Sequence, residues 1–216
     1  GIYAFTTVKP NSGIVPVPDK RLDIISQHIK ADKIVPTTME FVDIAGLIKG
    51  ASKEEGLGNK FLGHIRDVDA IAHVVRCFED NNVPHVSDTI DPVSDIDTIN
   101  TELMIADMES IERRLTNLAR KLKGGDKEAL QQQVLLQRAL EALEAGRPAR
   151  SVEVSGDDEK AWRMLQLLTS KPVLYVCNVE EASAAKGNSQ SDRVAEMAAR
   201  QGAGTVVISA RIEEEI

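Results

Sequence analysis

Residues 70–78 read "AIAHVVRCF", a near-continuous apolar run with the length of a strand. Such a run is typical of a strand in a parallel sheet whose two faces are both covered by helices. Similar runs are "MEFVDIA" (39–45), "PVLYVCN" (172–178) and "GTVVIS" (204–209), and "SGIVPVP" (12–18) reads as an edge strand. Helical patterns lie between these runs, at 19–31, 56–67, 157–169 and 190–201. The alternation predicts an α/β fold with a parallel sheet and helices on both faces.

The segment from residue 97 to 146 interrupts this alternation because its pattern is helical throughout. Its first part has an a/d seam of apolar residues: Met104, Met108, Ile111, Leu115, Leu118 and Leu122. After a turn with Asp126 as N-cap, its second part carries Leu130, Val134, Leu136, Leu140 and Leu143. We expect an antiparallel helical arm over 97–149, inserted into a main domain formed by 1–96 and 150–216. The alternative is a pair of helices packed flat on the sheet.

Composition limits the class of protein. The 216 residues are 42% hydrophobic and 28% charged, which fits a soluble globular protein. No apolar run approaches the ~20 residues of a membrane helix, and no signal peptide opens the chain, so we expect a cytoplasmic protein without a membrane partner. The net charge of −8 argues against a nucleic-acid coat, and we expect no DNA specificity. Cys77 and Cys177 lie in apolar runs and are interpreted as reduced core thiols rather than a disulfide or metal pair.

Asp43 and Gly46 form the first candidate site. They stand at the end of the run "MEFVDIA", and open α/β sheets bind ligands beyond the carboxyl ends of their strands. An acid there can hold a water on Mg²⁺, and a glycine amide can approach a terminal phosphate, as in P-loop nucleotidases. Asp-x-x-Gly is a short pattern, however, and an Asp at a strand end is also a common turn former or helix cap.

Three further segments fit the same kind of site. Asn178 follows an apolar strand in "NVEE", where guanine-binding proteins carry Asn-Lys-x-Asp, but Val179 and Glu181 replace the lysine and the aspartate. Ser209 and Ala210, in "SAR", follow the next strand, where backbone amides commonly face the purine. In "FTTVKPNSG" (5–13), Thr7 or its neighbour Thr6 offers a hydroxyl to Mg²⁺ in a loop that orders around nucleotide. The alternative for "NVEE" is an acidic surface turn.

Longer strings resemble a known family. These are "FTTVKPNSGIVPVPDKRLD", the run from "VPTTMEFVDIAGLIKG" to "VVRCFEDNNVPHV", and "INTEL". They resemble the YchF-type Obg-like ATPases, which are translation-associated P-loop nucleotidases, and the resemblance runs from about residue 3 to 216. It implies a Ras-like P-loop NTPase sheet with an inserted coiled-coil arm. It also implies that Thr7 ligates Mg²⁺, and that Asn178 and Glu181 match the Asn-x-x-Glu pattern of members that accept ATP over GTP.

The sequence also departs from this pattern. It contains no Gly-x-x-x-x-Gly-Lys-Ser loop and no C-terminal TGS domain, so we expect either a shortened chain or a P-loop segment left out. Leu47 stands where many GTPases place a glutamine that orients the attacking water, and a leucine cannot polarise water. The resemblance places at His85 a histidine that assists hydrolysis. The alternative for His85 is a surface histidine without a role.

Basic residues gather toward the tip of the predicted arm. Between residues 112 and 127 they face only Glu112 and Asp126, and they are Arg113, Arg114, Arg120, Lys121, Lys123 and Lys127. A local basic patch on an acidic protein predicts contact with RNA phosphates, for which ribosomal RNA is the expected partner. The alternative is an ordinary solvated coiled-coil face.

These observations favour a Mg²⁺-dependent nucleoside triphosphatase that hydrolyses ATP, with GTP as a second candidate substrate, coupled to ribosome or RNA binding. The alternative from another class is a nucleotide-switched ribosome- or RNA-binding module with little hydrolysis. A third possibility is an inactive fragment that lacks its P-loop.

Overall fold

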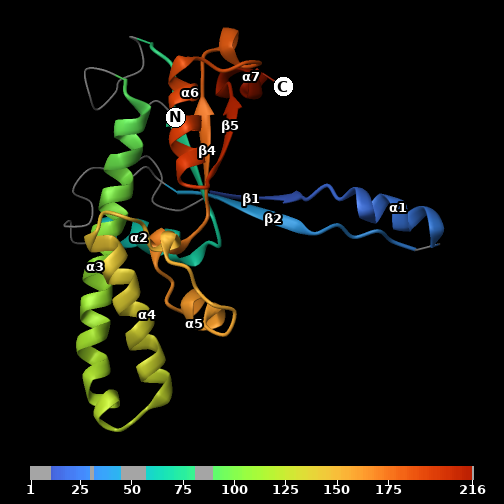
Figure 1. The fold of residues 1–216 in the computed structure, drawn as a ribbon. Helices are drawn as coiled ribbons and strands as arrows, with labels where there is room; N and C mark the ends of the chain where they lie inside the picture. Colours follow the sequence, from blue (N-terminus) through green and yellow to red (C-terminus); the bar gives the residue numbers. More distant parts are fainter. Residues whose placement is uncertain (1–10, 30–31, 45–56, 81–89, 216) are drawn as a thin grey trace. The chain divides into compact units, whose positions relative to one another are not determined.

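The computed structural model describes residues 11–29, 32–44, 57–80 and 90–215 (Figure 1). It divides the chain into two compact units, residues 1–46 and 47–216, and each is described by itself. In the described part of the chain, no helix is long and apolar enough to cross a membrane.

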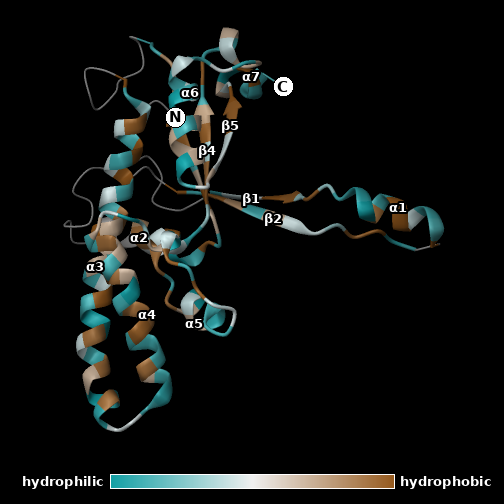
Figure 2. Cartoon of the chain, viewed as in Figure 1, coloured by the Kyte–Doolittle hydropathy of each residue, from teal (hydrophilic) through white to brown (hydrophobic). Residues whose placement is uncertain are grey.

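The first unit contains β1 (Asn11–Pro16), α1 (Lys20–His28) and β2 (Thr38–Asp43). The Asp19 carboxylate accepts a hydrogen bond from the Arg21 backbone N–H at 2.9 Å, which confirms Asp19 as the cap of the predicted helix. The strands pair antiparallel, with Asn11 opposite Asp43. The sequence predicts a strand of a parallel sheet at 39–45, whereas the described partner of β2 runs antiparallel to it. Figure 2 shows apolar residues along β1.

The second unit contains a three-stranded parallel sheet in the order β3 (Ile71–Arg76), β4 (Val173–Asn178) and β5 (Gly204–Ile208). Helix α6 (Ser189–Arg200) and the first turns of α3 (Pro92–Lys123) cover one face. The side chains buried there are Val75, Cys77, Ile96, Tyr175, Cys177, Val179, Val194, Met197 and Ala198. The mixed α/β fold with a parallel sheet is confirmed, and Cys77 and Cys177 are free, buried thiols as predicted.

The other face of this sheet differs from the prediction. Alternate side chains point to it, and Val74, Leu174 and Val206 are 63%, 43% and 39% exposed. The run that suggested a strand covered on both faces is therefore covered on one face by the residues that the structure describes. The reason is that α3 and α6, which fill the core of this sheet, both pack on the same side of it.

The predicted helical pair is present as α3 and α4 (Lys127–Glu144) (Figure 1). Helix α3 begins at Pro92, after the N-cap Asp91, and not at residue 97. Proline is favoured in the first turn of a helix because its missing N–H would have no partner there. At 32 residues, α3 is about 48 Å long. It carries Ile96 into the core of the sheet and Ile111 into the core of the arm, so one helix serves both.

On α3 the buried residues of the arm match the predicted apolar seam, whereas on α4 they differ in part from the apolar pattern of the sequence. Ile111 and Leu118 are buried, and the other seam residues of α3 pack partly buried against them. On α4, Leu130 and Val134, two of the apolar residues in the sequence pattern, are 55% and 47% exposed. The buried face of α4 passes instead through Ala129, Leu135, Leu136, Ala139, Ala142 and Leu143. Its alanines let the helices approach closely, and a search for large apolar residues overlooks them.

A buried carboxylate joins α3 to the segment that leads into β4. That segment contains η2 (Ala149–Ser151), α5 (Glu159–Met164) and η3 (Leu168–Ser170). Asp107, 1% exposed, accepts hydrogen bonds from the backbone N–H groups of Leu168 and Thr169, both at 2.8 Å, and from Thr169 Oγ1 at 2.7 Å. Burial raises the pKa of Asp107, and these hydrogen bonds oppose the rise.

A lysine ties α2 (Leu57–Asp67) to the same region. Lys171 Nζ donates to the backbone carbonyl of Arg66 at 2.7 Å and to that of Val68. Because Lys171 directly precedes the strand-leading Pro172, the amino end of β4 is held by both the arm and α2.

We predict that Asp107→Ala lowers the free energy of unfolding by about 2–4 kcal/mol, because it leaves two buried N–H groups without their acceptor. Asp97→Ala, an exposed substitution on the same helix, is the control and should change it by less than about 0.5 kcal/mol. Urea unfolding followed by circular dichroism measures both. Equal stability of the two variants would show that the Asp107 hydrogen bonds do not hold this junction together.

Candidate nucleotide-base site and basic arm

The carboxyl ends of β3, β4 and β5 lie side by side at one edge of the sheet. The ladder continues past the strands, since Val179 N–H donates to the Ile208 carbonyl at 2.9 Å and Cys77 N–H donates to the Asn178 carbonyl at 2.8 Å. These bonds bring together the two segments predicted to read the base, 178–181 and 209–210. Open α/β sheets bind ligands at this edge.

Asn178 is fixed in orientation by the second of these segments. Its Oδ1 accepts a hydrogen bond from the Ala210 backbone N–H at 2.9 Å. Because a backbone N–H can bond only to the oxygen of a carboxamide, the Nδ2 group of Asn178 is left to act as the donor. The Ala210 amide, predicted to face a purine, donates to Asn178 in this structure.

The remaining predicted base residues differ in burial. Val179 is 2% exposed and belongs to the sheet core, so it anchors the loop and does not cover a ligand. Glu181, in η4 (Glu181–Ser183), is exposed and pairs with Arg211 at 2.7 Å, Nε to Oε1. Arg211 belongs to α7 (Ala210–Glu215). Sequence reasoning missed Arg211, although it is the third residue of the "SAR" segment that drew attention.

Ser209 contributes an unsatisfied group to this edge. It is 3% exposed, and its Oγ has no hydrogen-bond partner among the residues that the structure describes. A buried hydroxyl without a partner is uncommon in a folded protein, and a bound ligand or water is a frequent explanation. The orphaned hydroxyl, beside the oriented Asn178, fits a site for a polar ligand.

Asn188 is a second residue that sequence reasoning missed. It caps α6 with its Oδ1, and its Nδ2 donates to the Cys77 carbonyl at 2.7 Å and to Glu180 Oε2 at 3.0 Å. It therefore links α6 to the ends of both β3 and β4. Gly187, at φ +76°, makes the turn before it, and a Cβ there would come within 2.5 Å of Ser191 Oγ. The pair Gly-Asn before a helical pattern was the available signal.

The loop after β4 is tightened by Glu180. Its carboxylate accepts hydrogen bonds from the Ser183 hydroxyl and from Asn188 Nδ2, and the bond from Ser183 is the main cause of its lowered pKa. The carboxylate is therefore a structural group of this loop, while its neighbour Glu181 faces Arg211.

The predicted phosphate and metal residues are described only in part. Asp43 is the last residue of β2, exposed, in the first unit. Thr7, Gly46, Leu47 and His85 lie outside the described residues. Within the described ranges, no group of three or more His, Cys, Asp or Glu side chains could hold a metal ion. Mg²⁺ binds through one or two protein oxygens together with phosphates and water, so the donor chemistry of Asp43 fits this ion.

The basic residues of the arm fall into two groups. Arg113, Arg120, Lys121 and Lys123 are exposed on α3. Arg114 is partly buried, its guanidinium donates to the Leu165 carbonyl at 2.6 Å, and burial lowers its pKa. Arg114 therefore fastens the arm to the segment after α5.

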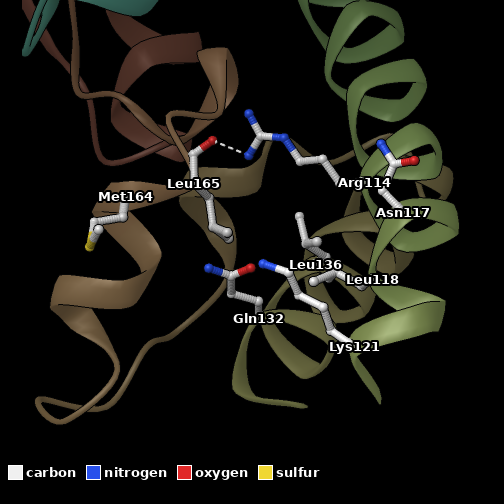
Figure 3. Close-up of a pocket in the computed structure, with 8 residues that line it drawn as sticks. All are labelled: Arg114, Asn117, Leu118, Lys121, Gln132, Leu136, Met164 and Leu165. Carbon is white, nitrogen blue, oxygen red and sulfur yellow. Dashed lines mark hydrogen bonds between the residues drawn. The ribbon is translucent and has the colours of Figure 1, made fainter. Parts of the chain in front are cut away.

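A groove of about 300 Å³ lies between α3, α4 and the end of α5, lined by Arg114, Asn117, Leu118, Lys121, Gln132, Leu136, Met164 and Leu165 (Figure 3). In this view Lys121 extends across the groove toward Gln132, and Arg114 points to Leu165. Two basic side chains line this groove, and one of them, Arg114, is already bonded to the Leu165 carbonyl.

Comparison with known proteins shows the class of protein to which the chain is similar. A family model described as "50S ribosome-binding GTPase" matches residues 1–108. The solved structure of the YchF GTPase of Schizosaccharomyces pombe matches with a TM-score of 0.76 and 34% identity, over 99% of this chain and 59% of that one.

Two curated relatives are both called "Ribosome-binding ATPase YchF". The protein of Bacillus subtilis is 51% identical over 216 residues, and that of Escherichia coli O157:H7 is 46% identical over 214 residues. Each match covers 99% of this chain and 59% of the relative, so the chain spans about three fifths of their length. The chain belongs to the 50S ribosome-binding GTPase family, and its resemblance to the YchF-type Obg-like ATPases is confirmed.

Proposed function

We propose that the protein is a Mg²⁺-dependent nucleoside triphosphatase that hydrolyses ATP, accepts GTP less well, and couples this to ribosome binding. The observation that carries the proposal is the base site at the ends of β4 and β5, where Asn178 is oriented by Ala210 and Ser209 Oγ has no described partner. Relatives named ribosome-binding ATPases support both the substrate and the partner.

The base end of the site works through shape and hydrogen bonds. Asn178 Nδ2 would donate to a ring nitrogen of the purine, and Val179 would hold the loop from beneath. Glu181 stands where a guanine-specific site has the shorter aspartate. A carboxylate one methylene longer cannot reproduce the two-bond geometry to the guanine N1–H and 2-amino groups without a shift of the backbone, so it accepts from guanine more weakly than an aspartate would. This argument favours ATP over GTP.

At the phosphate end, Asp43 and Thr7 would hold Mg²⁺, Asp43 through a water and Thr7 directly. The Gly46 amide would contact the terminal phosphate. When bound, Mg²⁺ neutralises charge that develops on the phosphate oxygens. Leu47 cannot orient the attacking water because its side chain has no polar group. His85 is the residue of this chain that we assign to the water.

The arm supplies the contact with RNA. Four basic residues are exposed along the same helix: Arg113, Arg120, Lys121 and Lys123. None of them takes part in the ion pairs between described residues. We assign them to ribosomal RNA phosphates. We assign Arg114 a structural role, joining α3 to the end of α5, because its guanidinium already donates to the Leu165 carbonyl.

One observation favours the alternative function, a nucleotide-switched ribosome-binding module with little hydrolysis. Helix α3 runs without a break from the sheet core to the arm core, so it connects the nucleotide domain to the basic surface directly. The two functions share one binding site and differ in whether turnover is needed.

An assay of phosphate release from ATP distinguishes the triphosphatase from the switch module. We expect His85→Ala to lower the rate of ATP hydrolysis by the intact protein about tenfold or more, with ATP affinity unchanged, because a group that handles the attacking water acts on the chemical step. His28→Ala, exposed on α1, is the control. If both variants hydrolyse ATP at the parental rate, His85 has no catalytic role. If the parental protein does not hydrolyse ATP with or without ribosomes, the switch module is the better description.

The base site makes a separate prediction. Asn178→Ala should weaken ATP and GTP alike by about tenfold, since it removes one hydrogen bond to the ring and frees the Ala210 N–H. Glu181→Asp should shift preference toward GTP, although Val179 limits the gain. Titration with fluorescent ATP and GTP measures both, and thermal unfolding checks that the fold is kept. A strong preference of the parental protein for GTP would contradict this assignment.

The basic residues of the arm give a third prediction. Replacing Arg113, Arg120, Lys121 and Lys123 by Ala should weaken binding to ribosomes and reduce the slope of log K against log salt by about 0.7–0.9 per lost phosphate contact. A control variant removes four exposed basic residues elsewhere: Lys20, Lys33, Lys186 and Arg200. Co-sedimentation with ribosomes over a salt series distinguishes them. Equal slopes in the two variants would assign the arm residues to a solvated face.

A further inference from the structure

The ion pair between Glu181 and Arg211 joins the two segments of the proposed base site, the one after β4 and the one after β5. Glu181 follows β4 and Arg211 follows β5, and Arg211 Nε lies 2.7 Å from Glu181 Oε1. Their side chains are 48% and 78% exposed, so the pair is open to solvent at this edge of the sheet. Neither residue needs this contact to satisfy a buried group.

The pair is held in place by its neighbours in the chain. Ala210, directly before Arg211, donates its N–H to Asn178 at 2.9 Å, and Glu213 N–H donates to the Ser209 carbonyl at 3.1 Å. The start of α7 is therefore fixed against the end of β4. Arg211 has a fixed backbone position from which its side chain reaches Glu181.

We propose that Arg211 is a specificity-determining positioning residue, which engages the Glu181 carboxylate and so favours adenine over guanine nucleotides. This inference rests on the proposed base site. Arg211 acts through Glu181 and is not assigned a contact with the nucleotide.

The chemistry follows from what each base presents. Guanine offers N1–H and a 2-amino group, both donors, so a guanine site needs a carboxylate free to accept from both. When Arg211 occupies one oxygen of Glu181, a guanine nucleotide must displace it or lose part of this recognition. Adenine has an acceptor at N1 and gains nothing from a free carboxylate there. When Arg211 pairs with Glu181, it also weakens the repulsion between the Glu181 carboxylate and the lone pair on adenine N1.

The expected effect is small and measurable. Exposed ion pairs are weak, so freeing Glu181 should change the ratio of GTP to ATP affinity by about two- to fivefold. In the intact protein, Arg211→Ala should raise GTP affinity relative to ATP, and Arg211→Lys should restore most of the parental ratio. Arg200→Ala, an exposed substitution on α6, removes the same charge away from the site and should leave the ratio unchanged.

Salt provides a readout that a merely structural role would not move. ATP and GTP carry the same phosphates, so their affinity ratio cancels the salt dependence of phosphate binding. The parental ratio should shift toward that of Arg211→Ala as salt screens the ion pair, while the ratio of Arg211→Ala stays constant.

Two results would overturn the proposal. One is an affinity ratio that Arg211→Ala leaves unchanged, and the other is an equal change in Arg200→Ala. Failure of the base site itself has a different signature, since Asn178→Ala would then leave the affinities for both nucleotides at their parental values.

Discussion

The three hydrogen bonds to the buried carboxylate of Asp107 are the contact on which the second unit depends. They fasten the middle of α3 to the segment just before β4, so the arm and the sheet share one junction. A charged group in this position is costly to desolvate unless donors surround it, and two backbone N–H groups and a hydroxyl do so here. Lys171 adds the end of α2 to the same place. Packing on either side of the junction then forms two separate cores, one in the arm and one beneath the sheet.

The opposite end of β4 carries the proposed base site, so one end of this strand is fixed to the arm junction and the other holds the candidate binding residues. Its amino end is fixed by the arm junction, and its carboxyl end presents Asn178. Asn178 accepts a hydrogen bond from the Ala210 N–H at 2.9 Å, and nearby Asn188 donates to the Cys77 carbonyl at 2.7 Å and to Glu180 at 3.0 Å. Their positions follow from the sheet ladder, which makes the site largely preformed. Ser209 Oγ is the exception, as a buried hydroxyl without a described partner.

Periodicity and strand-end position predicted the elements well, because both are local properties of the chain. The strands at 70–78, 172–178 and 204–209, the helical pair, and the caps Asp19 and Asp126 could all be read from neighbouring residues. Contacts between distant residues could not. Nothing local indicates that Arg211 meets Glu181, or that Asp107 lies beneath Thr169. Leu130 and Val134 belong to the apolar pattern of α4 but are exposed, and alanines, whose burial a sequence pattern hardly signals, form much of its buried face.

The unbroken course of α3 has a mechanical consequence. An α-helix is stiff along its axis, and this one has one end in the sheet core and the other at the tip of the arm. It therefore acts as a lever with its fulcrum at Asp107. About half of the helix, about 24 Å, lies on the arm side of Asp107, so a tilt of about 5° about this point displaces the tip by about 2 Å. Because the two halves of the helix are about equal in length, a displacement at the sheet end corresponds to one of about the same size, in the opposite direction, at the tip.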